Sequence, residues 1–150
     1  MRYWLLKTEP ESYSIDDLKR DKATSWEGVR NYQARNHIRA MEVGDGVIIY
    51  HSSCVPPGAV GVGKVVSAPR PDPTELNQDS GYYEPRATND KNIWSTIDIA
   101  FQKKFKHPVP LIEIKANKKL SGIEIVRTGS RLSVSPVSLA HFELLVEMGS

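Results

Sequence analysis

Two consecutive apolar segments in the middle of the chain constrain its fold more than any other feature. A turn at residues 44–46 leads into Val47–His51, a near-continuous apolar run that is typical of a strand covered on both faces. The next segment, Ala59–Val66, carries Gly61 and Gly63 on one face, because successive side chains of a strand point to opposite faces. Glycines in this arrangement favour a tightly curved barrel strand or the close approach of another group.

Short strands and short helices follow one another along the rest of the chain. Apolar alternation and turn signals predict further strands at Tyr3–Leu6, Ala23–Trp26, Trp94–Phe101 and within Gly129–Pro136. Capping residues and helical spacing predict helices at Ser14–Leu18, Asn31–Met41, Pro110–Lys115 and from Ser138 onward. Five or six strands with short helices indicate an α+β fold built on a small curved β-barrel. With no linker or repeat among 150 residues, we expect one domain over 1–150.

Helical spacing also predicts which side chains are buried. The expected inward positions are Ala34, Ile38 and Met41 in the second helix, and Leu139, Phe142, Leu145 and Val146 in the last. The opposite side of the second helix carries Tyr32, Arg35 and Arg39. Apolar positions are few between Pro69 and Asn92, and a loop of that length is usually functional or mobile.

The overall composition excludes several classes of protein. The net charge is only +2, so any anion site must come from local placement of Arg and Lys. No apolar run approaches the roughly 18 residues of a membrane span, and the N-terminus lacks the apolar core of a signal peptide. The lone Cys54 excludes an internal disulfide framework and fits a reducing cytoplasm. One Cys and four scattered His lack metal-ligand spacing, so we expect no metal site.

The stretch Trp26–Asn36 is the most informative about function. It combines an indole, a glycine, two arginines and a phenol, and it contains no acid–base pair suited to chemistry. A site that stacks a flat ring, reads its edge and holds a nearby anion needs this mixture. We therefore predict that the protein reads nucleic acid and has no catalytic residues.

Several aromatic side chains could wall a pocket for a base that has left its stack: Trp4, Trp26, Trp94, Tyr32 and Tyr50. Unstacking costs a few kcal/mol, and stacking on an aromatic side chain recovers about 1–3 kcal/mol per base. Large rings also dominate hydrophobic cores, so a core position is the alternative for each of them.

The residues after Trp26 suit close contact with a ligand. Gly28 lets the main chain approach a planar group, and the amides that follow, at Val29 and Arg30, can hydrogen-bond its edge. Asn31 can cap the helix and leave the positive end of its dipole facing an anion. A capped helix without any ligand is the alternative.

Cationic side chains lie close to this segment. Arg30 and Arg35 flank the predicted pocket, and bidentate guanidinium contacts to phosphate suit that position. For Arg39, phosphate contact and a solvated basic stripe are equally open. A second basic patch, usually just a solvated face, could touch more of a duplex: Lys103, Lys104, Lys106 and His107.

The segment His51-Ser52-Ser53-Cys54 raises the question of a nucleophile. His51 and Cys54 lie three residues apart and no orienting acid is identifiable, so a catalytic pair is disfavoured. Cys is also a common small buried hydrophobe. Hydrogen bonds from His51, Ser52 and Ser53 to a base edge or a phosphate are the better functional expectation.

The order of motifs along the chain resembles the EVE domain family. The matching segments cover essentially the whole chain: Tyr3–Pro10, Trp26–Asn36, Gly44-Asp45, Tyr50–Ser53, Tyr82-Tyr83, Asn89–Ser95 and Arg131–Val137. The resemblance implies a PUA-like fold, which is a small curved β-barrel flanked by helices. It also implies a reader of modified cytosine in DNA, with an RNA-binding module as the alternative.

The resemblance also refines the set of site residues. Trp26 becomes the favoured pocket wall because it precedes the glycine turn, whereas Trp4 and Trp94 stay open between pocket and core. By position in the matched motifs, the further phosphate candidates are Lys7, Arg131 and Ser133. We expect a monomer that binds DNA or RNA, with no cofactor and no membrane partner. The rivals are a nucleotide or small-ligand enzyme using His51 and Cys54, and a small-molecule sensor.

Overall fold

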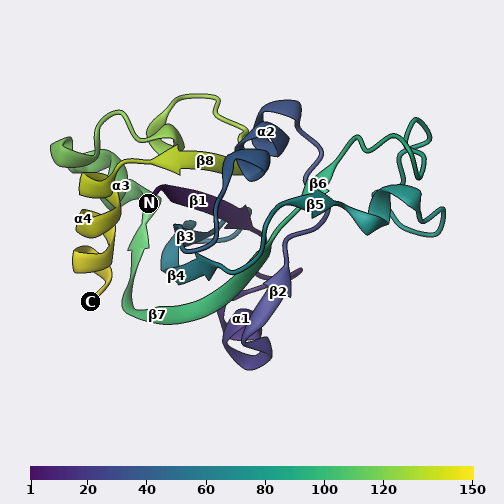
Figure 1. Ribbon diagram of the computed structural model, residues 1–150. Helices are drawn as coiled ribbons and strands as arrows, with labels where there is room; N and C mark the ends of the chain where they lie inside the picture. The colour runs from purple at the N-terminus through teal and green to yellow at the C-terminus, as the bar shows by residue number, and fades with distance from the viewer.

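Six strands form one curled sheet that carries short helices on both faces (Figure 1). The computed structural model describes residues 1–150. The strands are β1 (Tyr3–Thr8), β2 (Ala23–Ser25), β3 (Gly46–His51), β4 (Gly58–Val65), β7 (Asp98–Pro110) and β8 (Val134–Val137), in the order β2-β7-β4-β3-β1-β8. A separate two-stranded ladder pairs β5 (Arg70–Pro71) with β6 (Ser95–Thr96). The sheet is an open half-barrel, since β2 and β8 form its two edges, and it confirms the predicted α+β fold.

Most of the helices lie between these strands in the chain, and the last helix follows the last strand. They are α1 (Ile15–Asp21), α2 (Tyr32–Ala40), α3 (Leu111–Ala116) and α4 (Leu139–Gly149), with short 3-10 helices η1 (Pro73–Leu76), η2 (Lys118–Leu120) and η3 (Glu124–Val126). The side chains of Ser14, Asn31 and Ser138 each accept a backbone hydrogen bond at the start of a helix, as the sequence predicts. None of the helices has the length and apolar character needed to cross a membrane.

Glycine allows the sheet to curl where β4 pairs with β7. The register of this pair shifts between Ala59 and Gly61, and again between Val62 and Gly63. A Cβ on Gly61 would lie 2.5 Å from the Lys103 carbonyl oxygen, so no side chain fits there. The predicted role of Gly61 in a curved strand is therefore confirmed, and the bend of β7 across the sheet is visible in Figure 1.

Both faces of the sheet are covered, so the chain has two apolar clusters. Along β1, Trp4 and Leu6 belong to one cluster and Leu5 belongs to the other, as alternation predicts. Helices α1 and α2 pack on the first cluster, and α3 and α4 pack on the second. Trp4 is 3% exposed and Tyr50 is 2% exposed. These two candidate pocket aromatics are therefore core residues, because each stands on a strand that is covered on both faces.

Two details differ from the sequence-based expectations. The strand expected at Trp94–Phe101 is instead β6 followed by the long β7, which continues through the basic patch because Phe105, between two exposed lysines, and Val109, between two prolines, are buried. Leu139 is 51% exposed rather than buried. It is the first residue of α4, and the deeply buried apolar position of that helix is Leu145, nearly two turns further on.

Three buried carboxylates hold the long segment between β5 and β6 against the rest of the protein. Asp72 accepts hydrogen bonds from the Gly28 backbone at 2.8 Å and from the Arg30 guanidinium at 3.1 Å. Glu75 accepts from the Trp94 backbone at 2.6 Å, and Glu84 accepts from the Trp94 indole at 2.9 Å. The segment is therefore a fastened part of the fold, with its own hydrogen-bonded partners.

We expect Asp72→Asn to lower the free energy of unfolding by about 2–3 kcal/mol, because it removes the buried charge that Arg30 and the Gly28 amide face. Burial alone would raise the pKa of Asp72, but hydrogen bonds from Thr74, Gly28 and Arg30 outweigh it and hold the pKa below its ordinary value. Its contribution to stability is therefore complete above the unfolded-state pKa of about 4 and is lost as the pH falls through the lower folded-state pKa.

Urea unfolding of both proteins between about pH 7 and pH 3 measures this effect. The stability of Asp72→Asn should fall less steeply on acidification than that of the wild type. Asp79→Asn is the matched control, because Asp79 is exposed and its carboxylate makes no hydrogen bond. Equal pH dependence in the wild type and in Asp72→Asn would contradict the assignment.

Candidate nucleic-acid interface

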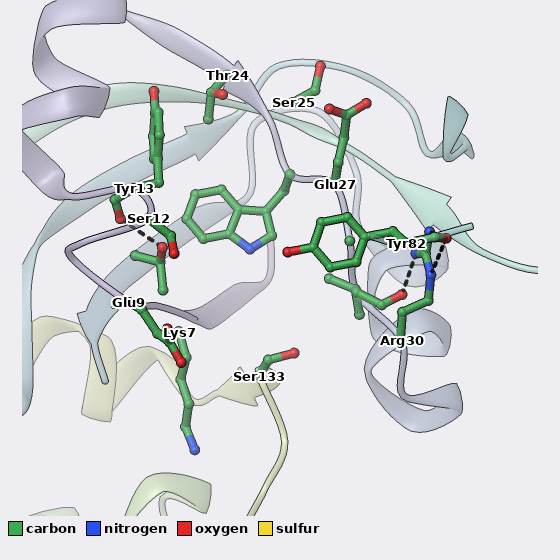
Figure 2. A pocket seen from close by; sticks show the side chains of 14 residues that line it. Lys7, Glu9, Ser12, Tyr13, Thr24, Ser25, Glu27, Arg30, Tyr82 and Ser133 are labelled. Carbon is green, nitrogen blue, oxygen red and sulfur yellow. Dashed lines mark hydrogen bonds between the residues drawn. The ribbon is translucent and has the colours of Figure 1, made fainter. Parts of the chain in front are cut away.

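A cavity of about 570 Å³ opens at the end of β1, beside β2 and the segment that follows β2 (Figure 2). Its walls come from four parts of the chain: residues 7–9 and 12–13, residues 24–30, Tyr82 and Ser133. The volume falls within the range of about 300–1,000 Å³ that small-molecule sites occupy. The cavity thus includes the first half of the Trp26–Asn36 stretch that the sequence singled out.

Three aromatic rings form the walls of this cavity. The Trp26 ring is 9% exposed and meets the Tyr13 ring edge to face, with the ring centroids 6.5 Å apart. Figure 2 shows Tyr13 and Tyr82 on opposite sides of the cavity, with the Tyr82 hydroxyl pointing into it. A flat ring that enters the cavity would therefore meet aromatic surface on several sides.

Gly28 permits the position of Tyr82. Its φ of +84° is in the left-handed region that favours glycine, and a Cβ there would lie 2.6 Å from Tyr82 Cζ. The sequence predicts that Gly28 allows a planar group to approach the main chain. In the structure that planar group is the Tyr82 ring.

Arg30 holds Tyr82 in place and has no donor left for another partner. Its guanidinium makes five hydrogen bonds, to the Tyr82 and Val29 carbonyl oxygens, the Asp72 carboxylate and the Thr74 hydroxyl. Two of the five go to Tyr82 O, at 2.6 and 3.2 Å. Arginine carries five N–H donors, so the set is complete. Arg30 lines the cavity but acts as a positioning residue, contrary to its predicted role in phosphate contact.

Lys7 is the cation of the cavity that remains free to bind an anion. Its side chain is half-buried and makes no hydrogen bond or ion pair within the protein. Burial lowers the pKa of Lys7, and the charge of Glu124 partly opposes that shift. Figure 2 shows Lys7 and Ser133 together on one side of the cavity, opposite Ser25 and Glu27. Both of these predicted phosphate contacts therefore line the site.

One carboxylate, that of Glu27, lies on the opposite side. Glu27 is exposed at the rim, and burial raises the pKa of Glu27, helped by the charges of Asp72 and Asp98 and opposed by Arg70. Glu9 is a second exposed carboxylate in the wall, and Figure 2 shows it beside Lys7; neither Glu27 nor Glu9 makes a hydrogen bond or ion pair within the protein. The cavity therefore offers hydrogen-bond acceptors on one side and an ammonium group on the other.

The second half of the Trp26–Asn36 stretch builds the scaffold behind the cavity. The Asn31 side chain caps α2 by accepting from Ala34 N at 2.9 Å. Tyr32 stacks on Trp94 with centroids 4.9 Å apart, and Arg35 lies over the Tyr32 ring and donates to Ile93 O. None of these lines the cavity, and Trp94 is 4% exposed, so it is a core residue.

The predicted contacts from His51 to Ser53 also lie outside the cavity. His51 Nε2 accepts a hydrogen bond from the backbone N–H of Ile15 at 3.1 Å, and burial lowers the pKa of His51. The Cys54 thiol donates toward Pro56 O at 3.5 Å, so His51 and Cys54 do not form a pair. Ser53 lies exposed in the turn after β3. Arg131 is exposed beside a different hollow, described below.

Sequence reasoning missed several residues of the wall, chiefly Tyr13, Tyr82 and Glu27. Tyr13 stands between β1 and α1, where nothing in the local pattern marks it. The presence of Tyr82-Tyr83 in a long loop with few apolar residues was the available signal, since such loops are often functional. Val29 and Gly28 were predicted and do line the cavity.

Comparisons with known proteins agree over the full length of the chain. The sequence model of the family described as EVE domain matches residues 2–148. Human thymocyte nuclear protein 1 is 37% identical in an alignment 164 positions long, which covers 97% of this chain and 73% of that protein. A crystal structure of a protein from Pseudomonas syringae is 45% identical, with a TM-score of 0.95 and 99% of both chains covered.

A further solved structure carries a ligand. It is the crystal structure of human THYN1 protein in complex with 5-methylcytosine-containing DNA, which is 34% identical, with a TM-score of 0.93. The match covers 100% of this chain and 98% of that one. The family model, the sequence identity and the fold agree, and the chain belongs to the EVE domain family.

Proposed function

We propose that this protein is a reader of modified cytosine in DNA, which it binds by holding one base in the cavity between Trp26, Tyr13 and Tyr82. The observation that carries the proposal is this aromatic cavity, open to solvent and bordered by the unpaired ammonium group of Lys7. The complex of the human relative with DNA containing 5-methylcytosine supports the choice of ligand.

The energies are of the right size for a base that leaves the duplex. Unstacking one base costs a few kcal/mol, and each aromatic partner returns about 1–3 kcal/mol. Trp26 and Tyr13 are held by the core and Tyr82 by Arg30, so little further ordering of side chains is needed. Lys7 supplies charge for a nearby phosphate, while the overall charge of +2 provides little long-range attraction.

Glu27 is our candidate for reading the edge of the base. Carboxylates accept hydrogen bonds from the exocyclic N4 amino group of cytosine, whereas thymine presents an acceptor, O4, at that position. Glu27 stands on the side opposite Lys7, so the amino edge of the base would face a carboxylate and the phosphate backbone would face an ammonium group.

The remaining expectations follow from the same contacts. His51 and Cys54 have other hydrogen-bond partners, which supports binding without catalysis. RNA stays the second candidate ligand, and a contact to a 2′-hydroxyl would distinguish the two. We expect a cytoplasmic monomer, the free thiol of Cys54 being compatible with a reducing compartment.

Binding of matched oligonucleotides with plain, methylated and hydroxymethylated cytosine, as DNA and as RNA, tests the function directly. We expect at least one modified DNA to bind about tenfold more tightly than its plain counterpart in fluorescence anisotropy at a single salt concentration. Equal affinity for all cytosines would contradict the proposal, and stronger binding of the RNA series would favour the alternative.

Tyr82→Ala should weaken binding of the preferred oligonucleotide by about 5–100-fold, because one stacking partner is lost. The Tyr82 side chain is 49% exposed, so the fold should tolerate its removal. Tyr83→Ala is the matched control: Tyr83 is 38% exposed, adjacent in sequence, and does not line the cavity. Isothermal titration of both variants measures the effect, and similar losses in the two would remove Tyr82 from the site.

Glu27→Gln should reduce discrimination between 5-methylcytosine and thymine, because an amide can donate to O4 as well as accept from N4. The two bases share the 5-methyl group, so the ratio of their affinities isolates the edge contact. We expect this ratio to fall by about tenfold. Glu9→Gln, the other free carboxylate in the wall, should leave it unchanged, and an unchanged ratio in Glu27→Gln would exclude Glu27 from base reading.

A further inference from the structure

Two adjoining hollows form a groove between α2 and η3, outside the base cavity. Their volumes are about 380 and 210 Å³. They share Gln33, Glu124, Arg127 and Leu132, so they form one surface, which we call the flanking groove. Gln33 and His37 stand four residues apart on α2 and face the groove from the same side of the helix.

Unsatisfied polar atoms are concentrated at this groove. In the whole protein, two buried side-chain polar atoms lack a hydrogen-bond partner: His37 Nε2 and Ser130 Oγ. His37 lines the larger hollow and Ser130 lines the smaller one. Buried polar groups without partners are rare and unfavourable, and they often mark a functional site. Burial lowers the pKa of His37, so the neutral ring has one donor and one acceptor nitrogen.

The charge of the groove favours an anion. Arg127 and Arg131 contribute two guanidinium groups, and Glu124 contributes one carboxylate. Arg127 lies 3.5 Å from Glu124, whereas Arg131 is exposed and makes no ion pair or hydrogen bond within the protein. The planar fork of Arg131 is therefore free to bind phosphate in a bidentate way. Leu132 and other apolar side chains provide a surface for the uncharged part of a ligand.

The groove begins where the base cavity ends. Ser133 lines the cavity, and its neighbour Leu132 lines the groove. The backbone N–H of Lys7 donates to Ser133 O at 2.8 Å, so the two walls are joined by the main chain. Lys7 lines the cavity and Glu124 lines the groove, yet the two are close enough for the charge of Glu124 to oppose part of the lowering of the Lys7 pKa by burial. A strand that leaves the cavity on the side of Lys7 and Ser133 therefore meets the groove.

We propose that the flanking groove binds the nucleotide adjacent to the base in the cavity, with Arg131 contacting its phosphate and Gln33 contacting its base or sugar. This inference rests on the proposed function, since it needs a base in the cavity. It adds a second nucleotide subsite and predicts that recognition extends beyond the modified base itself.

A length series of single-stranded DNA tests the subsite. The probes are 5-methyl-deoxycytidine 5′-monophosphate, and the same nucleotide extended by one thymidine 5′-monophosphate on the 5′ side or by one thymidine on the 3′ side, so that each extension adds one phosphate. We expect one of the extended probes to bind the wild-type protein about tenfold more tightly than the mononucleotide. In Arg131→Ala most of that gain should be lost, while affinity for the mononucleotide stays within about twofold.

Two further variants separate the subsite from general electrostatics. Gln33→Ala removes a neutral side chain of the groove and should also reduce the gain. Lys64→Ala removes one exposed positive charge that lines neither hollow, and it should keep the gain. The ring signals of His37 in NMR spectra should shift with the favoured extended probe and not with the mononucleotide.

The outcomes distinguish this inference from the function on which it rests. Equal affinity of the mononucleotide and both extended probes for the wild type would overturn the subsite, and so would an undiminished gain in Arg131→Ala. A preference for methylated over plain cytosine would survive either result. Conversely, a gain that depends on Arg131, together with equal affinity for methylated and plain probes of the same length, would support the groove and contradict the reading of the modification.

Discussion

The contact between Asp72 and the segment Gly28–Arg30 is the interaction on which the candidate site depends. Asp72 is fully buried, and its carboxylate accepts from the Gly28 amide and the Arg30 guanidinium. Arg30 in turn donates a hydrogen bond to the Tyr82 carbonyl oxygen, and its guanidinium carbon lies 5.4 Å from the centroid of the Tyr82 ring. One buried charge thus joins two segments that are far apart in the sequence and places an aromatic wall of the cavity. Because the sheet beneath is rigid, the site combines loop-borne residues with a well-defined position.

The arginines in the Trp26–Asn36 stretch, and Arg39 after it, bind other parts of the protein and thereby build the site. All five N–H donors of Arg30 make hydrogen bonds within the protein, and Arg35 and Arg39 both donate to the Ile93 carbonyl oxygen. Among the cations that line the cavity and the groove, those that lack internal partners are Lys7 and Arg131, which come from distant parts of the chain. A residue type suited to phosphate therefore indicates a binding site only when its donors are free. This distinction needs coordinates, since the sequence shows the guanidinium and not its partners.

The sequence predicts the fold better than it predicts the site, for a physical reason. Strands and helices follow from local periodicity and caps, and Gly61 indicates curvature because its backbone neighbour leaves no room for a side chain. Pocket membership depends on tertiary neighbours. Trp4 and Trp94 could not be assigned from the sequence, and both proved to be core rings whose indole N–H groups meet buried carboxylates. The sequence does not predict Tyr13 as a wall residue of the cavity, because only folding brings it against Trp26.

The distribution of charge around the cavity favours recognition of a ligand by its shape and hydrogen bonds, and not by attraction to the net charge of the protein. Glu27 borders one side, Lys7 borders the other, and the flanking groove continues the side of Lys7 through Arg131. A nucleotide strand has the same asymmetry, because its bases carry amino donors and its backbone carries phosphates. In the proposed function, such a surface would orient a strand before the base enters, and it would disfavour the reversed orientation, which places phosphate near Glu27. Specificity can therefore arise in a protein whose net charge is only +2.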